Sequence, residues 1–179
     1  MELDRVLTLK AFERLDQALG EKGLPFTRMT VGGGASMLLA HGFPGKTNDV
    51  DAVPTKGANF EDIKILAEKI AQELGIAHDW LNPYFQTFTV YLPSDAKDRM
   101  TVIYNGPHLV VESLGPEDVL IMKLMAGRSK DRAHIRHLLK KAKIDLSVVE
   151  NRLEALKSQN LYKKEAVKAL DLLDEETDP

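Results

Sequence analysis

The sequence predicts an α/β (α+β) fold, in which a small mixed β-sheet with flanking helices precedes a C-terminal helical bundle. Up to about residue 114, short apolar runs typical of strands alternate with amphipathic helical segments, and the rest of the chain has helical spacing. Three consecutive glycines, Gly32-Gly33-Gly34, join the first strand-like run to a helix. We therefore expect an α/β core at residues 1–114 and a helical part at residues 115–179, packed as one compact unit.

The first half of the chain predicts helices and strands in alternation. Glycine and proline mark their ends, since Pro25 cannot continue the first helix and Pro54 is expected to end the second strand. The expected elements are a helix at 4–21, a strand at 26–31, a buried helix at 35–40, a strand at 49–53 and an amphipathic helix at 60–74.

The second half predicts three more strands and then only helices. Alternation of Tyr84, Gln86, Phe88, Val90 and Leu92 indicates a strand. The aromatic residues Trp80, Tyr84 and Phe85 are expected to pack against the sheet rather than stack a base. The expected elements are strands at 84–92, 100–104 and 109–111, and helices from Pro116, at about 130–142, from near Leu146 and from near Leu161.

Composition excludes several classes of protein. The 179 residues are 44% hydrophobic and 28% charged, as in a globular domain, and the absence of cysteine excludes disulfides and cysteine nucleophiles. No apolar run approaches the ~18 residues of a membrane span, and the first residues lack a secretory pattern, so we expect a cytoplasmic protein without membrane contact. The net charge of −3 argues against a general nucleic-acid binder, although a basic segment at 123–143 leaves local RNA binding open.

Two aspartates follow the glycine turn on the next predicted strand. Asp49 and Asp51 are two residues apart, so a strand places them on one face, and a divalent cation relieves the repulsion between such carboxylates. The small residues before Ser36 allow a phosphate to approach the backbone at the start of a helix. Together the two features predict a nucleotide or metal–phosphate site.

One alternative phosphate motif is excluded by its position. Gly45-Lys46-Thr47 resembles the end of a G-x-x-x-x-G-K-[ST] loop, but Ala40 stands where the first glycine belongs. That loop follows a strand and opens a helix, whereas here a helix precedes and a strand follows.

Several segments carry a resemblance to a known family. Val31-Gly32-Gly33 and Asp49-Val50-Asp51 resemble the paired motifs of the nucleotidyltransferase fold of the DNA polymerase beta superfamily. The chain is also similar to small bacterial nucleotidyltransferase-like proteins, including AbiEii-type toxins of toxin–antitoxin pairs. That likeness lies in three segments: Lys46-Thr47-Asn48-Asp49, the stretch from Lys123 to Asp131 with its K-L-x-A-x-R-x-K-D pattern, and Asp79-Trp80-Leu81-Asn82.

The resemblance implies a set of site residues. Asp49 and Asp51 would ligate Mg²⁺ (or Mn²⁺), Lys123 would stabilise charge, and Glu112 would supply a third catalytic carboxylate. The implied nucleotide-binding residues are Gly32, Gly33, Gly34, Ser36, Lys46, Thr47, Arg128 and Lys130.

The resemblance also implies a reaction, which is magnesium-dependent transfer of a nucleoside monophosphate from an NTP to a hydroxyl on protein or RNA, with an antitoxin as a partner. The alternative is a catalytically silent binding protein with the same fold. Two departures from the family pattern motivate it. Candidates for the third carboxylate are Glu112, Asp95 or Asp98, none in a clear strand pattern, and His134 stands where relatives often place an aspartate.

Overall fold

The computed structural model describes residues 2–177, whose contacts group into two units. The first unit comprises the chain up to Thr87 together with Met100–Leu114, and the second comprises Phe88–Arg99 together with the chain from Gly115 onward. The second unit therefore combines a segment from the middle of the chain with the residues from Gly115 onward. No helix in the described part of the chain is long and apolar enough to cross a membrane.

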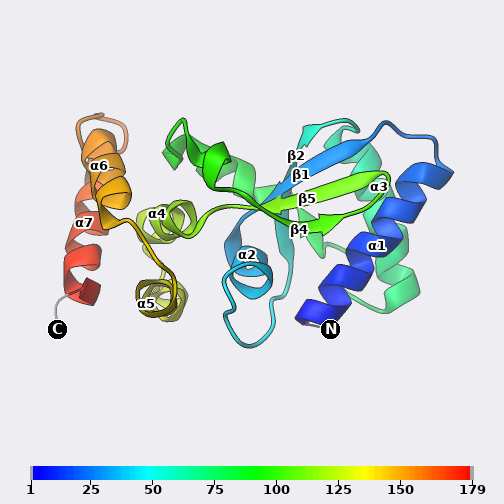
Figure 1. Ribbon diagram of the computed structural model, residues 1–179, viewed down its shortest axis with the longest axis horizontal. Helices are drawn as coiled ribbons and strands as arrows, with labels where there is room; N and C mark the ends of the chain where they lie inside the picture. The colour runs from blue at the N-terminus through cyan, green and yellow to red at the C-terminus, as the bar shows by residue number, and fades with distance from the viewer. Residues whose placement is uncertain (1, 178–179) are drawn as a thin grey trace. The chain divides into compact units, whose positions relative to one another are not determined.

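The first unit is built on a five-stranded mixed sheet, which confirms the predicted fold class. Its order is β3-β2-β1-β5-β4, with β1 parallel to β5 and antiparallel to β2 (Figure 1). The strands are β1 (Thr27–Val31), β2 (Val50–Lys56), β3 (Leu81–Asn82), β4 (Thr101–Asn105) and β5 (Leu109–Ser113).

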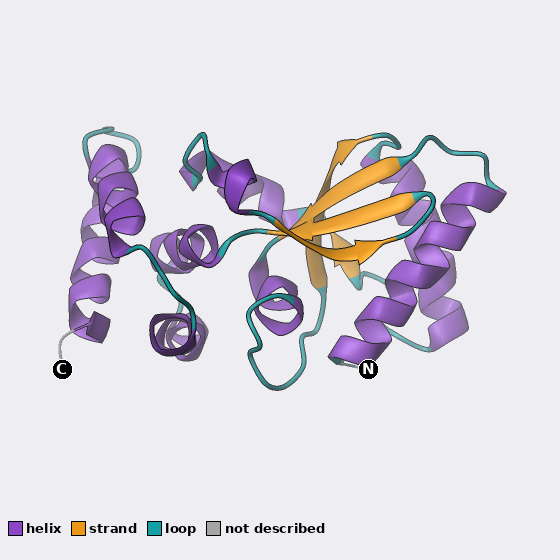
Figure 2. Cartoon of the chain, viewed as in Figure 1, coloured by secondary structure: helices purple, strands orange, loops and turns teal. Residues whose placement is uncertain are grey.

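Three helices accompany this sheet. They are α1 (Arg5–Glu21), α2 (Gly33–Leu39) and α3 (Phe60–Leu74), and α1 and α3 pack against each other (Figure 2). The bounds of α3 agree with the sequence prediction, because Asn59 caps its first turn and Gly75 adopts the left-handed conformation at its end.

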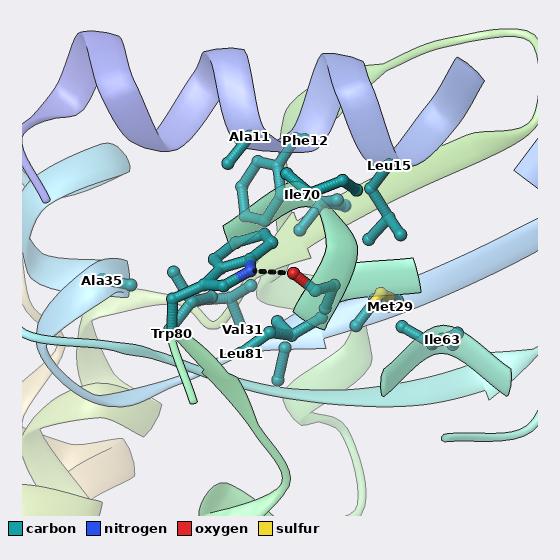
Figure 3. Close-up of a cluster of buried hydrophobic side chains, with 14 of the residues drawn as sticks. Ala11, Phe12, Leu15, Met29, Val31, Ala35, Ile63, Ile70, Trp80 and Leu81 are labelled. Carbon is teal, nitrogen blue, oxygen red and sulfur yellow. Dashed lines mark hydrogen bonds between the residues drawn. The ribbon is translucent and has the colours of Figure 1, made fainter. Parts of the chain in front are cut away.

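The core of the first unit lies between these two helices and one face of the sheet. Phe12 and Leu15 of α1 and Ile70 of α3 are fully or almost fully buried with Met29 of β1 (Figure 3). Trp80 lies among them, and its indole N–H donates to the Ala67 carbonyl at 2.9 Å. The predicted packing of Trp80 is confirmed, whereas Tyr84, for which packing was also predicted, is exposed.

Two expectations about strands were wrong. The segment predicted as a strand at 84–92 forms the 3₁₀ helix η1 (Tyr84–Tyr91), with a bond from Gln86 N–H to the Pro83 carbonyl of 2.8 Å. Pro54 lies within β2 instead of ending it. A proline is tolerated there because β3 pairs only with Val50 and Asp51, and the register against β1 shifts near Pro54.

The second unit is helical. α4 contacts each of the other three long helices, and α6 packs on α7. Its elements are the 3₁₀ helix η2 (Ala96–Arg99), α4 (Pro116–Ala126), the 3₁₀ helix η3 (Ser129–Asp131), α5 (Arg132–Lys141), α6 (Leu146–Lys157) and α7 (Lys163–Thr177). Each of the four long helices lies close to its predicted position, since its apolar residues recur at helical spacing.

Candidate functional site

The glycine turn connects β1 to α2 and closes against the Asp51 carboxylate. Gly33 has a φ of +60°, in the left-handed region that favours glycine. A methyl group added to Gly33 would overlap the Asp51 carboxylate oxygen Oδ2. The backbone N–H of Gly32 donates to the Asp51 carbonyl at 3.0 Å. Gly33 is therefore required both for the turn and for the close approach of the Asp51 side chain.

The two neighbouring glycines are also in close contacts. A methyl group on Gly34 would lie 2.8 Å from Thr47 Oγ1, and one on Gly32 would lie 2.6 Å from the Phe85 ring. Thr47 Oγ1 donates to the Asp49 carbonyl at 3.0 Å, so Thr47 links the turn to the start of β2. The side chains of Thr47, Asp51 and Phe85 therefore all pack closely against the turn.

Asp51 lies on the side of β2 that faces away from the core, and Asp49 immediately precedes this strand. Val50 and Ala52 are fully buried in the core, whereas both aspartates are half-buried. Asp51 lies against the glycine turn, and Asp49 lies two residues before it at the start of β2. The grouping of both carboxylates and the turn into one site stays a prediction.

Asn82 belongs to the same group, and the sequence prediction missed it. Its Nδ2 donates to Asp49 Oδ2 at 3.0 Å, and its backbone is in register with Asp51 in the parallel β2–β3 pair. The resemblance of the segment from Asp79 to Asn82 was the available signal, but it assigned no role to any of its residues.

Ser36 is buried, whereas Lys46 is exposed. Ser36 is fully buried, and its hydroxyl lies 2.6 Å from the hydroxyl of Ser113 on β5. In this structure the Ser36 side chain therefore stabilises the contact between α2 and the sheet. Lys46 is exposed on the loop that leads to Thr47 and the aspartates.

Glu112 shares the face of Asp51 but binds an arginine. Thr30 is in register with both Glu112 of β5 and Val53 of β2, and residues in register on neighbouring strands share a face. The Glu112 carboxylate forms an ion pair with Arg28. Two strand spacings of about 4.8 Å separate β2 from β5. The Glu112 carboxylate is therefore paired with the Arg28 guanidinium and lies two strands away from β2.

The other two acidic candidates lie in the second unit. Asp95 forms an ion pair with Arg99 at 2.8 Å, and Arg99 also binds the buried Asp118 at 2.8 Å. Hydrogen bonding from Arg99 lowers the pKa of Asp95. Asp98 is exposed on η2. Asp95 has a structural partner within its own unit.

Two of the three predicted basic residues of the helical part, Lys123 and Arg128, contact the buried carboxylate of Asp131. Lys123 is a buried residue, only 3% exposed, and its Nζ lies 2.9 Å from Asp131 Oδ1. Arg128 Nε lies 2.6 Å from the other carboxylate oxygen, Oδ2. His134 Nδ1 lies 3.7 Å from Oδ1. Burial opposes ionisation of Asp131, but His134, Lys123 and Arg128 together hold its pKa below the ordinary value. Lys130 is exposed on η3.

The aspartate pair has the chemistry of a magnesium or manganese site. Carboxylate oxygens are the hard ligands that these ions prefer, and two charges on one face favour a divalent cation. Among residues 2–177, no three histidine, aspartate or glutamate side chains gather closely enough to form a metal cluster. Asp49 and Asp51 have the ligand chemistry that such a cation needs, and the Asn82 amide contacts Asp49.

The mixed sheet with a glycine turn beside Asp51 agrees with the fold that the resemblance to nucleotidyltransferases predicted. Residues 8–174 match the family described as "Nucleotidyltransferase of unknown function (DUF6036)", and the chain belongs to this family. No curated protein and no solved structure matches the chain.

Proposed function

We propose that the protein transfers a nucleoside monophosphate from an NTP to a hydroxyl group on protein or RNA in the cytoplasm. The observation that carries this proposal is the packing of Gly33 directly against Asp51. It joins the expected phosphate-binding turn to one of the expected metal-binding carboxylates.

Each residue of the group has a separate part in the proposal. Asp49 and Asp51 would hold Mg²⁺ (or Mn²⁺), which supplies charge neutralisation for the triphosphate when bound. Backbone N–H groups of the glycine turn, at the start of α2, would donate to a phosphate. The space beside the three glycine Cα atoms is itself filled by the Phe85, Asp51 and Thr47 side chains. The exposed Lys46 is placed on the loop before the aspartates, where it would add a positive charge.

Lys123, Arg128 and Lys130 remain proposed phosphate ligands from the helical part. Lys123 and Arg128 already contact Asp131, so they would bind phosphate only in exchange for this carboxylate or in addition to it. Lys130 is exposed on η3. The likeness to AbiEii-type toxins extends the proposal to a toxin that an antitoxin protein neutralises.

A labelling experiment tests the transfer. The protein is incubated with Mg²⁺, each of the four α-labelled NTPs, and cellular protein and RNA as acceptors. We expect label in a macromolecular product, its loss in Asp49→Asn, and wild-type labelling in the exposed control Asp171→Asn. Protease and nuclease treatment of the product distinguishes the two acceptors. Absence of transfer with every NTP, together with NTP affinity that is the same in Asp49→Asn, contradicts the proposal.

The ion pair of Glu112 with Arg28 favours a second candidate function, a nucleotide-binding protein without turnover. Catalytic members of the wider superfamily use a third carboxylate. Here the candidate on the same face as Asp51 is Glu112, and its carboxylate is paired with Arg28. NTP binding that depends on Asp49, without transfer to any acceptor, supports this second candidate.

A further inference from the structure

Asn82 holds two partners through the two ends of its side-chain amide. Nδ2 donates to Asp49 Oδ2 at 3.0 Å, and Oδ1 accepts from the backbone N–H of Tyr84 at 3.0 Å. A backbone N–H can only donate, so the amide oxygen must face Tyr84 and the amide nitrogen must face Asp49. The orientation of the amide is thereby fixed.

We propose that Asn82 is a positioning residue for the cation site of Asp49 and Asp51. This inference rests on the proposed function, since it gives that site a supporting contact. The amide occupies Oδ2 of Asp49 and leaves Oδ1 to a cation. Because the amide is neutral, it orients the carboxylate without cancelling the charge that attracts the cation, as a lysine or arginine would.

The backbone around Asn82 is held rigidly by the core. Val50 N–H donates to the Trp80 carbonyl at 2.6 Å, which locks the short strand β3 onto β2. Trp80 is fully buried and bonded to the Ala67 carbonyl of α3. The buried tryptophan therefore fixes the position of Asn82, and Asn82 fixes the carboxylate of Asp49.

Titration of the full chain with Mn²⁺ alone, by isothermal titration calorimetry, tests the inference. We expect Asn82→Ala to weaken Mn²⁺ binding about 10-fold or more, as loss of a ligand's supporting contact does in other metal sites. Asn82→Ser keeps a hydroxyl acceptor for the Tyr84 N–H but has no amide to donate to Asp49, so it is expected to weaken Mn²⁺ binding as Asn82→Ala does. Asn151→Ala, on the exposed surface of α6, is the control and should bind as the wild type does.

The outcomes separate this inference from the proposed function. If Asp49→Asn abolishes Mn²⁺ binding while Asn82→Ala binds as the wild type does, only the role of Asn82 is overturned. A wild type that does not bind Mn²⁺ overturns both. A purely structural role for Asn82 would lower the unfolding temperatures of the variants and leave their Mn²⁺ affinity unchanged. If Asn82→Ala does not fold, Asn82→Ser decides, and affinity equal to the wild type overturns the inference.

Discussion

Replacing Gly33 by alanine tests whether the turn is built around the Asp51 carboxylate. At a φ of +60°, alanine costs about 1–2 kcal/mol because its Cβ crowds the backbone in the left-handed region. The new methyl group also displaces the Asp51 carboxylate, and forcing that side chain about 30° from its rotamer costs about 0.5–1.5 kcal/mol. We therefore expect Gly33→Ala to lower the free energy of unfolding by about 1.5–3.5 kcal/mol.

The chain offers a matched control at Gly23. This glycine has a φ of +62°, but a methyl group there would meet no atom within 4 Å. Gly23→Ala should therefore show only the backbone cost of about 1–2 kcal/mol. The difference between the two variants isolates the displacement of Asp51, which is also expected to weaken Mn²⁺ binding in Gly33→Ala alone.

Urea denaturation followed by circular dichroism measures the two free energies, and calorimetry measures Mn²⁺ affinity. The reasoning is refuted if both variants lose the same stability within about 0.3 kcal/mol and Gly33→Ala binds Mn²⁺ as Gly23→Ala does. That result would mean that the Asp51 carboxylate does not rest on the turn.

Three further predictions concern buried contacts. Asp131→Ala leaves the ammonium group of Lys123, a residue only 3% exposed, without its carboxylate partner. Urea denaturation should therefore show that the free energy of unfolding falls by about 3–5 kcal/mol. A fall below about 1 kcal/mol would contradict the stabilising role of this ion pair. The folded-state pKa of Asp131 lies below its unfolded value of 3.8, so its stabilisation is present above that value and lost as the pH falls through the folded pKa. Below about pH 4 the wild type should thus lose more stability than Asp131→Asn, and parallel stability curves for the two proteins would refute this. Trp80→Phe removes the hydrogen bond to the Ala67 carbonyl and part of the buried volume, with an expected loss of about 1–3 kcal/mol, whereas the exposed control Tyr84→Phe should unfold as the wild type does.

Local patterns in the sequence predicted most of the elements, because their causes lie within a few residues. α3 was predicted from Phe60 to Leu74, since its apolar residues recur at helical spacing and Gly75 supplies the left-handed end. The start of α4 at Pro116 has the same kind of local cause, since proline suits the first helical turn.

The segment from Tyr84 to Tyr91 shows where a local pattern fails. Its alternating residues are typical of a strand, but a strand also needs a neighbour with which to pair. β2 already pairs with β3 at Leu81–Asn82, and the following residues form 3₁₀ bonds such as the one from Leu92 N–H to the Thr89 carbonyl. The conformation of this segment depends on whether a neighbouring strand is available to pair with it. The alternation of its residues does not give that information.

The sequence by itself determined that a glycine turn precedes two aspartates at the start of the next strand, because three consecutive glycines and a D-x-D spacing are local features. Only the tertiary structure showed that Asp51 rests on Gly33 and that Asn82 holds Asp49. It alone also placed Arg28 on Glu112. These contacts join residues between 18 and 84 positions apart, and their existence depends on strand order and register, which the whole packed sheet fixes.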